Sequence, residues 1–347
     1  MRALLCLFFS ISLFSCQKDD TQLIPKDAEP PTDVIQDGLN ITLLQKAVKN
    51  ASESSNFYGL VVIKDEKVII EEYFRGKGPE DRFPIRSITK NFTSALTGIA
   101  IDQGLLDDLD YQIKNAYPEL AGTSKEQITV RHLLNMSSGL KWNEEQEVVD
   151  LIELKIQDPI GELLSRDLET EPGTIFNYNT VSPHIVTDII AKKSGVSFKD
   201  YAIANLLDPL EISSFSWDTD PDGNVWGGLG LELKTRDLSK FGQLFLNNGM
   251  WNGKSVVPTE WVTLSSTAQI DLPQSTSKYS LQWYVADNLD RKVYFGQGFG
   301  GQVLMLIPDE NMMIIAVQEY LVTFAQNNQQ WINFQEKVFP LIYQSIQ

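Results

Sequence analysis

Ser87 and Lys90, in the run Ser87-Ile88-Thr89-Lys90, open an amphipathic stretch that continues to Gly104. If this stretch is helical, the two side chains lie on one face because they are three residues apart. A serine hydroxyl is a weak nucleophile at neutral pH, whereas a lysine removed from water loses its proton and can act as the adjacent base. The helix start also offers backbone N–H groups and a positive dipole end to a developing oxyanion. These residues predict a serine–lysine nucleophile within one helical turn.

The Ser-x-x-Lys pattern alone is weak, because it also occurs at Ser15–Lys18, Ser138–Lys141 and Ser275–Lys278. The first of these spans a predicted processing site, the second contains a helix-disfavouring glycine, and the third lies in a polar, loop-like run. Only the Ser87 match opens an apolar-periodic helix. The alternative interpretation is a surface serine and lysine in the first turn of a core helix.

The segment Glu171–Thr180 is the second candidate, since its Pro-Gly turn delivers Tyr178 beside Asn179 and Thr180. A tyrosine hydroxyl near a lysine ammonium can be shifted toward phenolate and carry a proton from the nucleophile to the leaving group. A packed aromatic side chain is the competing interpretation.

The segment Tyr294–Gln302 is the third candidate, with four glycines within six residues at the start of a strand. Such glycines let a ligand approach the backbone, and a main-chain N–H here can serve as a second oxyanion donor. A hairpin turn is the alternative. A dinucleotide site is disfavoured because this run leads into a strand rather than a helix.

A Ser-His-Asp hydrolase is a competing mechanism that the sequence argues against. The chain has two histidines, His132 and His184, and no Gly-x-Ser-x-Gly elbow. His132 has apolar neighbours at helical spacing and is interpreted as structural, while His184 follows Pro183 at a helix start. Two isolated histidines also argue against a metal hydrolase. The serine–lysine mechanism needs neither a metal nor an organic cofactor.

The first fifteen residues predict a secretory signal peptide, with Arg2 before a short apolar run. Leu13-Phe14-Ser15-Cys16 resembles a bacterial lipobox, although Phe14 departs from the usual small or aliphatic residue. The resemblance implies lipidation at Cys16 and a lipid-anchored protein of the bacterial cell envelope, at the outer membrane. The following Lys-Asp-Asp run looks like a surface-export signal. A cleaved peptide that leaves Cys16 free is the alternative.

Composition narrows the classes of partner. The only cysteines are Cys6 and Cys16, so the mature domain has no disulfide and depends on its core. The net charge of −17 argues against nucleic acid. The predicted membrane contact is through the N-terminal lipid alone, and the sequence leaves the oligomeric state open.

Strand patterns near both ends of the chain, with helical patterns between them, predict one antiparallel sheet with a helical insertion. A proline-containing tether is expected over residues 16–39. Helices are expected over residues 41–52, 87–104, 235–247 (with Thr235 as N-cap) and 329–343. Strands are expected over residues 57–63, 67–74, 279–285, 292–295, 302–307 and 312–318.

The three candidate segments, in this order, resemble the serine β-lactamase and penicillin-binding-protein superfamily. The most similar branch contains class C β-lactamases, DD-peptidases, family VIII-type esterases and 6-aminohexanoate-dimer hydrolases. The resemblance spans about residues 57–343 and is also carried by residues 83–90, 128–140 and 238–249.

The resemblance implies a mixed α/β fold of the α+β type. This β-lactamase/transpeptidase-like fold has an antiparallel sheet flanked by helices, an all-helical subdomain, and the site in the cleft between them. The hydrolase domain would span residues 40–347. Its α/β part would comprise about residues 40–86 and 227–347, and its helical part about residues 87–226.

By position, the resemblance implies that Ser87 is the acylated nucleophile, Lys90 its general base and Tyr178 a proton relay. The family's third motif falls on Gly296-Gln297-Gly298, and Phe299 would add its backbone N–H to that of Ser87 in the oxyanion hole. The residues implied as substrate contacts are Trp142, Thr180, Gln297, Gly298 and Gly300.

Two departures from the family pattern bear on the substrate, which is expected to be a small-molecule or peptide-like ester or amide. The usual Tyr-x-Asn reads Tyr178-Asn179-Thr180, and Gly296 stands where relatives have a lysine or histidine. The missing cation disfavours β-lactams and peptidoglycan stems and favours esters and linear amides. Whether Arg86 replaces it is left open. A β-lactamase or DD-peptidase, and a catalytically impaired envelope binding protein, stay as alternatives.

Overall fold

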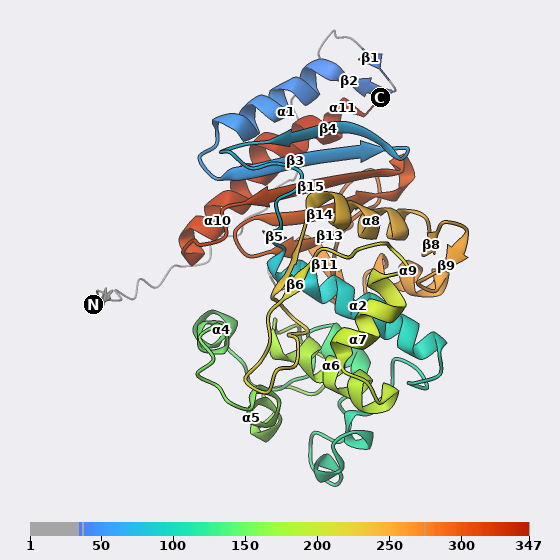
Figure 1. The fold of residues 1–347 in the computed structure, drawn as a ribbon. Helices are drawn as coiled ribbons and strands as arrows, with labels where there is room; N and C mark the ends of the chain where they lie inside the picture. The colour runs from blue at the N-terminus through green and yellow to red at the C-terminus, as the bar shows by residue number, and fades with distance from the viewer. Residues whose placement is uncertain (1–34, 37, 274, 347) are drawn as a thin grey trace.

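The computed structural model describes residues 35–36, 38–273 and 275–346. Its main feature is an antiparallel sheet of eight strands in the order β10-β11-β12-β13-β14-β15-β3-β4. The strands are β3 (Phe57–Lys64), β4 (Lys67–Tyr73), β10 (Ile270–Asp271), β11 (Ser277–Ser280), β12 (Trp283–Ala286), β13 (Val293–Gly298), β14 (Gln302–Ile307) and β15 (Met312–Gln318). Because β3 pairs with β15 along its length, the sheet joins the two ends of the chain, as predicted (Figure 1).

Tight turns set the register of the outer hairpins. Asp65 and Glu66 join β3 to β4 with φ values of 49° and 62°, the left-handed conformation that two-residue hairpin turns require. Asn311 has φ 43° just before β15 and donates a side-chain hydrogen bond to Asp65. Aspartate and asparagine tolerate this conformation better than β-branched residues do, which suits Asp65 and Asn311 to these corners.

Helices cover both faces of the sheet, because alternate residues of the central strands point to opposite sides. One face packs against α1 (Ile41–Glu53), α10 (Phe324–Asn333), the π-helical turn η6 (Phe334–Val338) and α11 (Phe339–Ser345). The other face packs against α2 (Thr89–Asp102) and α8 (Thr235–Leu246). A Cβ atom at Gly242 would lie 3.0 Å from Met313, so this glycine allows α8 to approach the sheet closely.

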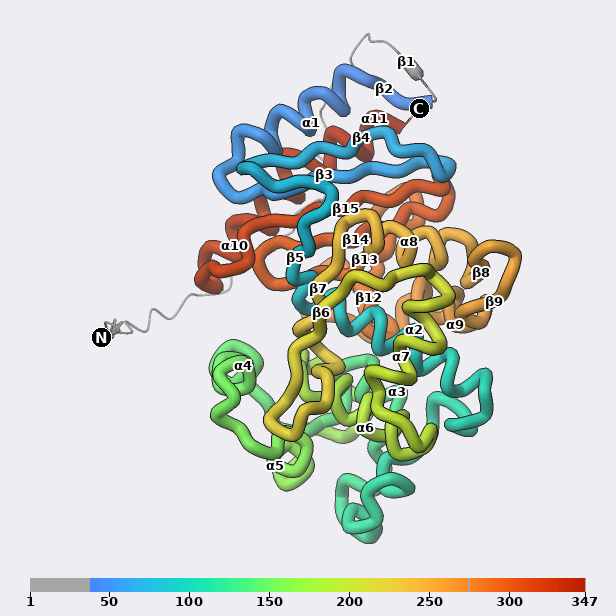
Figure 2. Tube along the Cα trace, in the orientation of Figure 1, coloured from blue at the N-terminus to red at the C-terminus, as the bar shows by residue number. Residues whose placement is uncertain are grey.

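The helical part lies beside the second face, at the bottom of the view in Figures 1 and 2. It contains α3 (Val130–Leu134), α4 (Glu144–Ile152), α5 (Pro159–Ser165), α6 (Val181–Ser194), α7 (Phe198–Ala202) and the π-helical turn η4 (Ile203–Leu207), with 3₁₀ turns η2 (Ile113–Asn115) and η3 (Pro118–Leu120). A three-stranded sheet of β5 (Phe83–Pro84), β7 (Leu231–Leu233) and β6 (Ser216–Trp217) connects the two parts. The residue bounds given above for the α/β part and the helical part stay a prediction.

The remaining elements are short: β1 (Ile35–Gln36), β2 (Leu39–Asn40), β8 (Met250–Trp251), β9 (Lys254–Ser255), α9 (Thr259–Ser265) and the 3₁₀ turn η5 (Pro308–Glu310). Leu39, at the end of the expected tether, is fully buried, so the packed part of the chain already includes it. The predicted signal peptide and Cys16 lie outside the described residues. Within those residues, none of the helices combines the length and the apolar character that a membrane span needs.

Among the predicted elements that differ from the structure, three lie outside the segments of Ser87 and Gly296. The expected strand 279–285 is a hairpin of β11 and β12, because Leu281 and Gln282 turn with φ values of 43° and 74° and the Leu281 N–H binds the Asn135 side chain. The last helical region starts earlier, at Phe324, where Thr323 and Gln326 form a capping box. Thr235 is the first residue of α8 rather than its N-cap, which is Lys234.

Candidate active site

Ser87 lies in a 3₁₀ turn, η1 (Arg86–Ile88), and not in the α-helix that the sequence predicted from residue 87. The helix α2 begins only at Thr89. Arg86, with φ 52°, takes the left-handed conformation directly before Ser87, a strained arrangement of the kind that clusters at functional sites. The Thr89 hydroxyl donates to the Arg86 carbonyl and accepts from the Leu231 N–H, which ties the turn to β7.

Lys90 lies one turn further on and is almost fully buried, whereas Ser87 is partly exposed. The Lys90 Nζ atom is 3.0 Å from Ser87 Oγ, 3.1 Å from Thr180 Oγ1 and 2.7 Å from the Gly228 carbonyl oxygen. Burial lowers the pKa of Lys90 to about 8, against the opposing influence of the Glu144 charge. A substantial fraction of Lys90 is therefore neutral near pH 8 and able to accept a proton.

Tyr178 lies over the same lysine, with its ring centroid 4.8 Å from Lys90 Nζ. Burial raises the pKa of Tyr178 well above its ordinary value, and a hydrogen-bond interaction with Ser87 only partly opposes this. This direction is opposite to the expected shift toward phenolate, because loss of solvent around this partly exposed tyrosine outweighs the effect of Ser87. Tyr178 keeps its proton next to Ser87, where it can donate it.

Gly227 and Gly228, which precede β7, pack against α2 beside Lys90. The sequence analysis did not assign this glycine pair a function. The Gly228 carbonyl accepts from Lys90, and the Gly227 carbonyl accepts from Thr93 at 2.7 Å. A Cβ atom at Gly228 would lie 2.5 Å from the Thr180 carbonyl oxygen, so no larger residue fits there. Two adjacent glycines ahead of a short strand were the available sequence signal.

Glu144 is a second residue that the sequence analysis missed. Its Oε1 atom accepts the Thr180 hydroxyl, and its Oε2 atom accepts from the Thr180 N–H at 3.0 Å and from Trp142 Nε1 at 2.7 Å. Trp142 is buried, and its ring packs under the Arg166 guanidinium. Trp142 therefore lies behind Glu144, which agrees with packing better than with the implied substrate contact.

The end of β13 packs directly against the segment that precedes Ser87. A Cβ atom at Gly298 would lie 2.4 Å from the Ile85 carbonyl oxygen, and one at Gly296 would lie 2.3 Å from Asn91 Oδ1. Asn91 is itself buried and donates to the Gln282 carbonyl at 2.9 Å. A lysine or histidine, which the resemblance places in this motif, would fit at position 296 only if Asn91 moved.

Arg86 does not point freely into this space. Its guanidinium stacks over the Tyr320 ring, 5.1 Å from the centroid, and donates to the Tyr320 carbonyl at 3.4 Å. Burial lowers the pKa of Arg86, while the charges of Asp218 and Glu232 oppose the shift. Arg86 is thus engaged by neighbours of its own.

The turn after β13 is held by α10. The Phe299 ring packs edge-on against Phe324, and the Gly300 N–H donates to Asn327 Oδ1 at 2.7 Å. The Gly300 carbonyl accepts from Gln302 and from Gln330. Gly300 therefore positions the turn instead of offering its polar groups to a substrate. Gln297 is partly exposed, and Gly298 is buried.

A series of aromatic contacts runs from the Tyr178 segment into the sheet. Phe176 contacts Tyr279 edge-on, Tyr279 contacts Tyr284 edge-on, and Tyr284 stacks on Phe295 at 5.2 Å. Tyr284 is partly exposed, and its charge would raise the pKa of Tyr178, so the two hydroxyls are near each other. Phe176 and Tyr284 are partly exposed, whereas Tyr279 and Phe295 are buried and Phe295 belongs to the core on the α1 side.

The two histidines have structural partners. His132 accepts from the Thr129 N–H in the capping box of α3. His184 is buried, with Nε2 3.1 Å from Asp220 Oδ2 and Nδ1 3.4 Å from the Gly227 N–H. His184 therefore supports the loop that holds Lys90.

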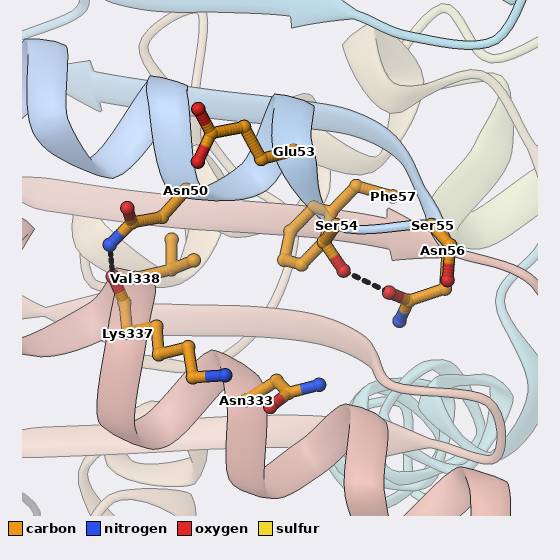
Figure 3. A pocket seen from close by; sticks show the side chains of 9 residues that line it. All are labelled: Asn50, Glu53, Ser54, Ser55, Asn56, Phe57, Asn333, Lys337 and Val338. Atoms are coloured by element: carbon orange, nitrogen blue, oxygen red, sulfur yellow. Dashed lines mark hydrogen bonds between the residues drawn. The ribbon is translucent and has the colours of Figure 1, made fainter.

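A separate pocket of about 330 Å³ opens on the other face of the sheet, between the end of α1, the start of β3 and η6 (Figure 3). Figure 3 shows Asn50 of α1 donating to the Lys337 carbonyl across it. Phe57 and Val338 at its base belong to the core on the α1 side, whereas Ser87 lies on the α2 side. The pocket is therefore not continuous with the Ser87 constellation.

Comparisons with known proteins agree with this geometry. Residues 44–330 match a family model described as Beta-lactamase. The 6-aminohexanoate-dimer hydrolase of Paenarthrobacter ureafaciens is 25% identical over 286 residues, which cover 75% of this chain and 72% of that protein.

Solved structures extend the likeness to the fold. A candidate 6-aminohexanoate-dimer hydrolase from Bacillus anthracis superposes with a TM-score of 0.73 at 21% identity, covering 82% of this chain and 79% of that one. A D-stereospecific amidohydrolase from Streptomyces sp. gives a TM-score of 0.64 at 18% identity, covering 85% of this chain and 98% of that one. The predicted mixed α/β fold is confirmed.

Proposed function

Because this chain belongs to the β-lactamase family of serine hydrolases, we propose that it cleaves a carboxylic ester or linear amide through an acyl-enzyme on Ser87. One observation carries the proposal: Ser87 Oγ is 3.0 Å from the buried Nζ of Lys90, whose pKa is lowered to about 8. A nucleophile within hydrogen-bond reach of a base that is partly neutral can be activated at physiological pH.

The proposed reaction has two halves. Ser87 Oγ attacks the carbonyl carbon as its proton passes to Lys90 Nζ, and the backbone N–H groups of Ser87 and Phe299 stabilise the oxyanion. The contact of Gly298 with the Ile85 carbonyl, which brings the β13 turn beside η1, supports this pairing. Tyr178 donates its proton to the leaving group and is reprotonated from Lys90. Water then releases the acyl group.

The substrate preference rests on charge and shape. Two cations were considered as partners for a substrate carboxylate. The one at position 296 is absent, because Gly296 stands there and Asn91 fills the space beside it. The other, Arg86, is stacked on Tyr320. The partly exposed rings of Phe176 and Tyr284 can offer apolar contacts instead. Relatives named as amide hydrolases are consistent with an amide or ester substrate.

The test is intact-mass spectrometry of the described domain, as wild type and Ser87→Ala, after exposure to a p-nitrophenyl ester and separately to a penicillin. We expect nitrophenol release by the wild type alone and no lasting penicillin adduct. A stable penicillin adduct on Ser87, or rapid penicillin hydrolysis, would instead identify a DD-peptidase or β-lactamase. Absence of any reaction at Ser87 would favour a binding protein.

A further inference from the structure

The Thr180 hydroxyl lies between Glu144 and Lys90. Thr180 and Lys90 are buried, whereas Glu144 is partly exposed. As a carboxylate, Glu144 can only accept hydrogen bonds, so the proton of the Thr180 hydroxyl is committed to Glu144 Oε1. The Thr180 N–H and the Trp142 indole both donate to Oε2 and keep the carboxylate in this orientation. The Thr180 oxygen is left with its lone pairs facing Lys90 Nζ, 3.1 Å away.

This fixes how a neutral Lys90 can hydrogen-bond. A neutral amine has two N–H donors and one lone pair, and Lys90 Nζ has three neighbours. The Gly228 carbonyl can only accept, and Thr180 Oγ1 can only accept because its proton is already used. Both N–H donors are therefore taken, and the lone pair is left facing Ser87 Oγ at 3.0 Å.

We propose that Glu144 is a positioning residue that, through the Thr180 hydroxyl, aims the lone pair of neutral Lys90 at the proton of Ser87. The role rests on the proposed function, in which Lys90 is the base. During attack, one proton moves from Ser87 Oγ to Lys90 Nζ as the new C–O bond forms and the carbonyl π electrons move to oxygen. Glu144 takes no part in the proton transfer, and Thr180 keeps its proton throughout.

The proposal also gives a reason for threonine at this position, where the family resemblance implies the asparagine of a Tyr-x-Asn motif. An asparagine amide can contact Lys90 with its carbonyl unaided. A hydroxyl can donate or accept, so it needs a second group to fix its direction. Glu144, which the chain supplies from the first turn of α4, is that group.

The central test is Glu144→Gln, which removes the charge at nearly constant shape. The Thr180 N–H and the Trp142 indole both need the acceptor at Oε2, so the Gln carbonyl stays there and its NH₂ faces the Thr180 hydroxyl. Thr180 then turns its proton toward Lys90 and competes for the lone pair. We expect the rate of Ser87 modification by a fluorophosphonate to fall by about tenfold to a hundredfold, less than complete loss of a general base.

Three further variants separate positioning from mere packing. Thr180→Val should lose as much rate as Glu144→Gln, and Thr180→Ser, which restores the hydroxyl, should recover most of it. The double variant Glu144→Gln/Thr180→Val should be no slower than the slower single variant, because both act through one contact. Glu145→Gln is the matched control, since Glu145 is exposed on the same turn of α4 and loses the same charge.

The pH profile gives a readout that a structural role would not move. The Glu144 charge raises the pKa of Lys90, so its removal should shift the rise in rate to lower pH while the plateau also falls. An unshifted profile with a plateau equal to that of Glu145→Gln would overturn the role of Glu144, as would fully additive losses in the double variant. If wild-type Ser87 itself does not react, the proposed function fails and this role fails with it. Should Glu144→Gln not fold, the Thr180→Val and Thr180→Ser pair decides the question.

Discussion

At the scale of single residues, the chemistry of the site depends on how far Lys90 is removed from water. Lys90 reacts as a base only when neutral, and its pKa of about 8 lies well below the ordinary lysine value of 10.5. The rate of Ser87 phosphonylation should therefore rise roughly tenfold per pH unit below about pH 8 and level off above it. The rate constant measured from pH 6 to pH 10, by intact mass, tests this at about half-unit steps.

Lys90→Ala is the companion to that profile. It should lower the plateau by orders of magnitude and remove the rise near pH 8, because the titrating base is gone. A wild-type profile that is flat, or one centred near the ordinary lysine pKa, would contradict the assignment of Lys90 as a partly neutral base. So would full activity in a folded Lys90→Ala protein.

At the scale of elements, the close packing of β13 on α2 leaves little room for a side chain, and so for a cation, at position 296. Gly296→Ala places a Cβ atom against Asn91 Oδ1 in a buried contact, which should cost about 1–3 kcal/mol of stability. Asn91→Ala makes room but loses the hydrogen bond to the Gln282 carbonyl. In the double variant the two losses should be less than additive, because the collision no longer occurs.

Urea denaturation of the two single variants and the double variant measures this coupling. Gly78→Ala is the control, since a Cβ atom there meets nothing within 4 Å and should change stability by less than about 1 kcal/mol. Strictly additive losses would show that Asn91 does not exclude side chains from position 296. In that case the missing cation would need another explanation.

The elements also show which parts of the fold local sequence can predict. Strands β14 and β15 have the predicted bounds because each is a short apolar run between turn residues. The hairpin at Leu281 and Gln282 was missed, since its turn is stabilised by Asn135 from a distant segment. The 3₁₀ turn at Ser87 was missed for a similar reason: Thr89 and β7 hold it through tertiary contacts.

The residues of the site also fall into those that local sequence could predict and those that it could not. Ser87 and Lys90 were predictable because their spacing within one turn brings them together whether the turn is 3₁₀ or α-helical. Glu144 was not, because its partner Thr180 lies 36 residues away and an acidic residue early in a helix is ordinary. The direction of the Tyr178 pKa was also misjudged, since burial is a property of the folded site and outweighs its neighbours.

At the scale of the whole molecule, the site and the sheet share one core. Phe92 of α2, Trp226 beside the glycine pair and Leu304 of β14 belong to one continuous cluster of buried apolar residues. The residues around Lys90 come from segments 90 and 138 positions away along the chain. Because the site is completed by segments far apart along the chain, we expect it to be lost together with the sheet.

This predicts one cooperative unfolding transition despite the two structural parts. In urea, circular dichroism, tryptophan fluorescence and Ser87 phosphonylation should share a midpoint. Phe339→Ala, a fully buried change on the opposite face of the sheet, should cost about 3–5 kcal/mol and lower all three midpoints equally. The exposed Val68→Ala should change the free energy of unfolding by about 0.5 kcal/mol or less. Loss of phosphonylation at lower urea than loss of the sheet would mean that the helical part unfolds by itself and that the site is held by local contacts alone.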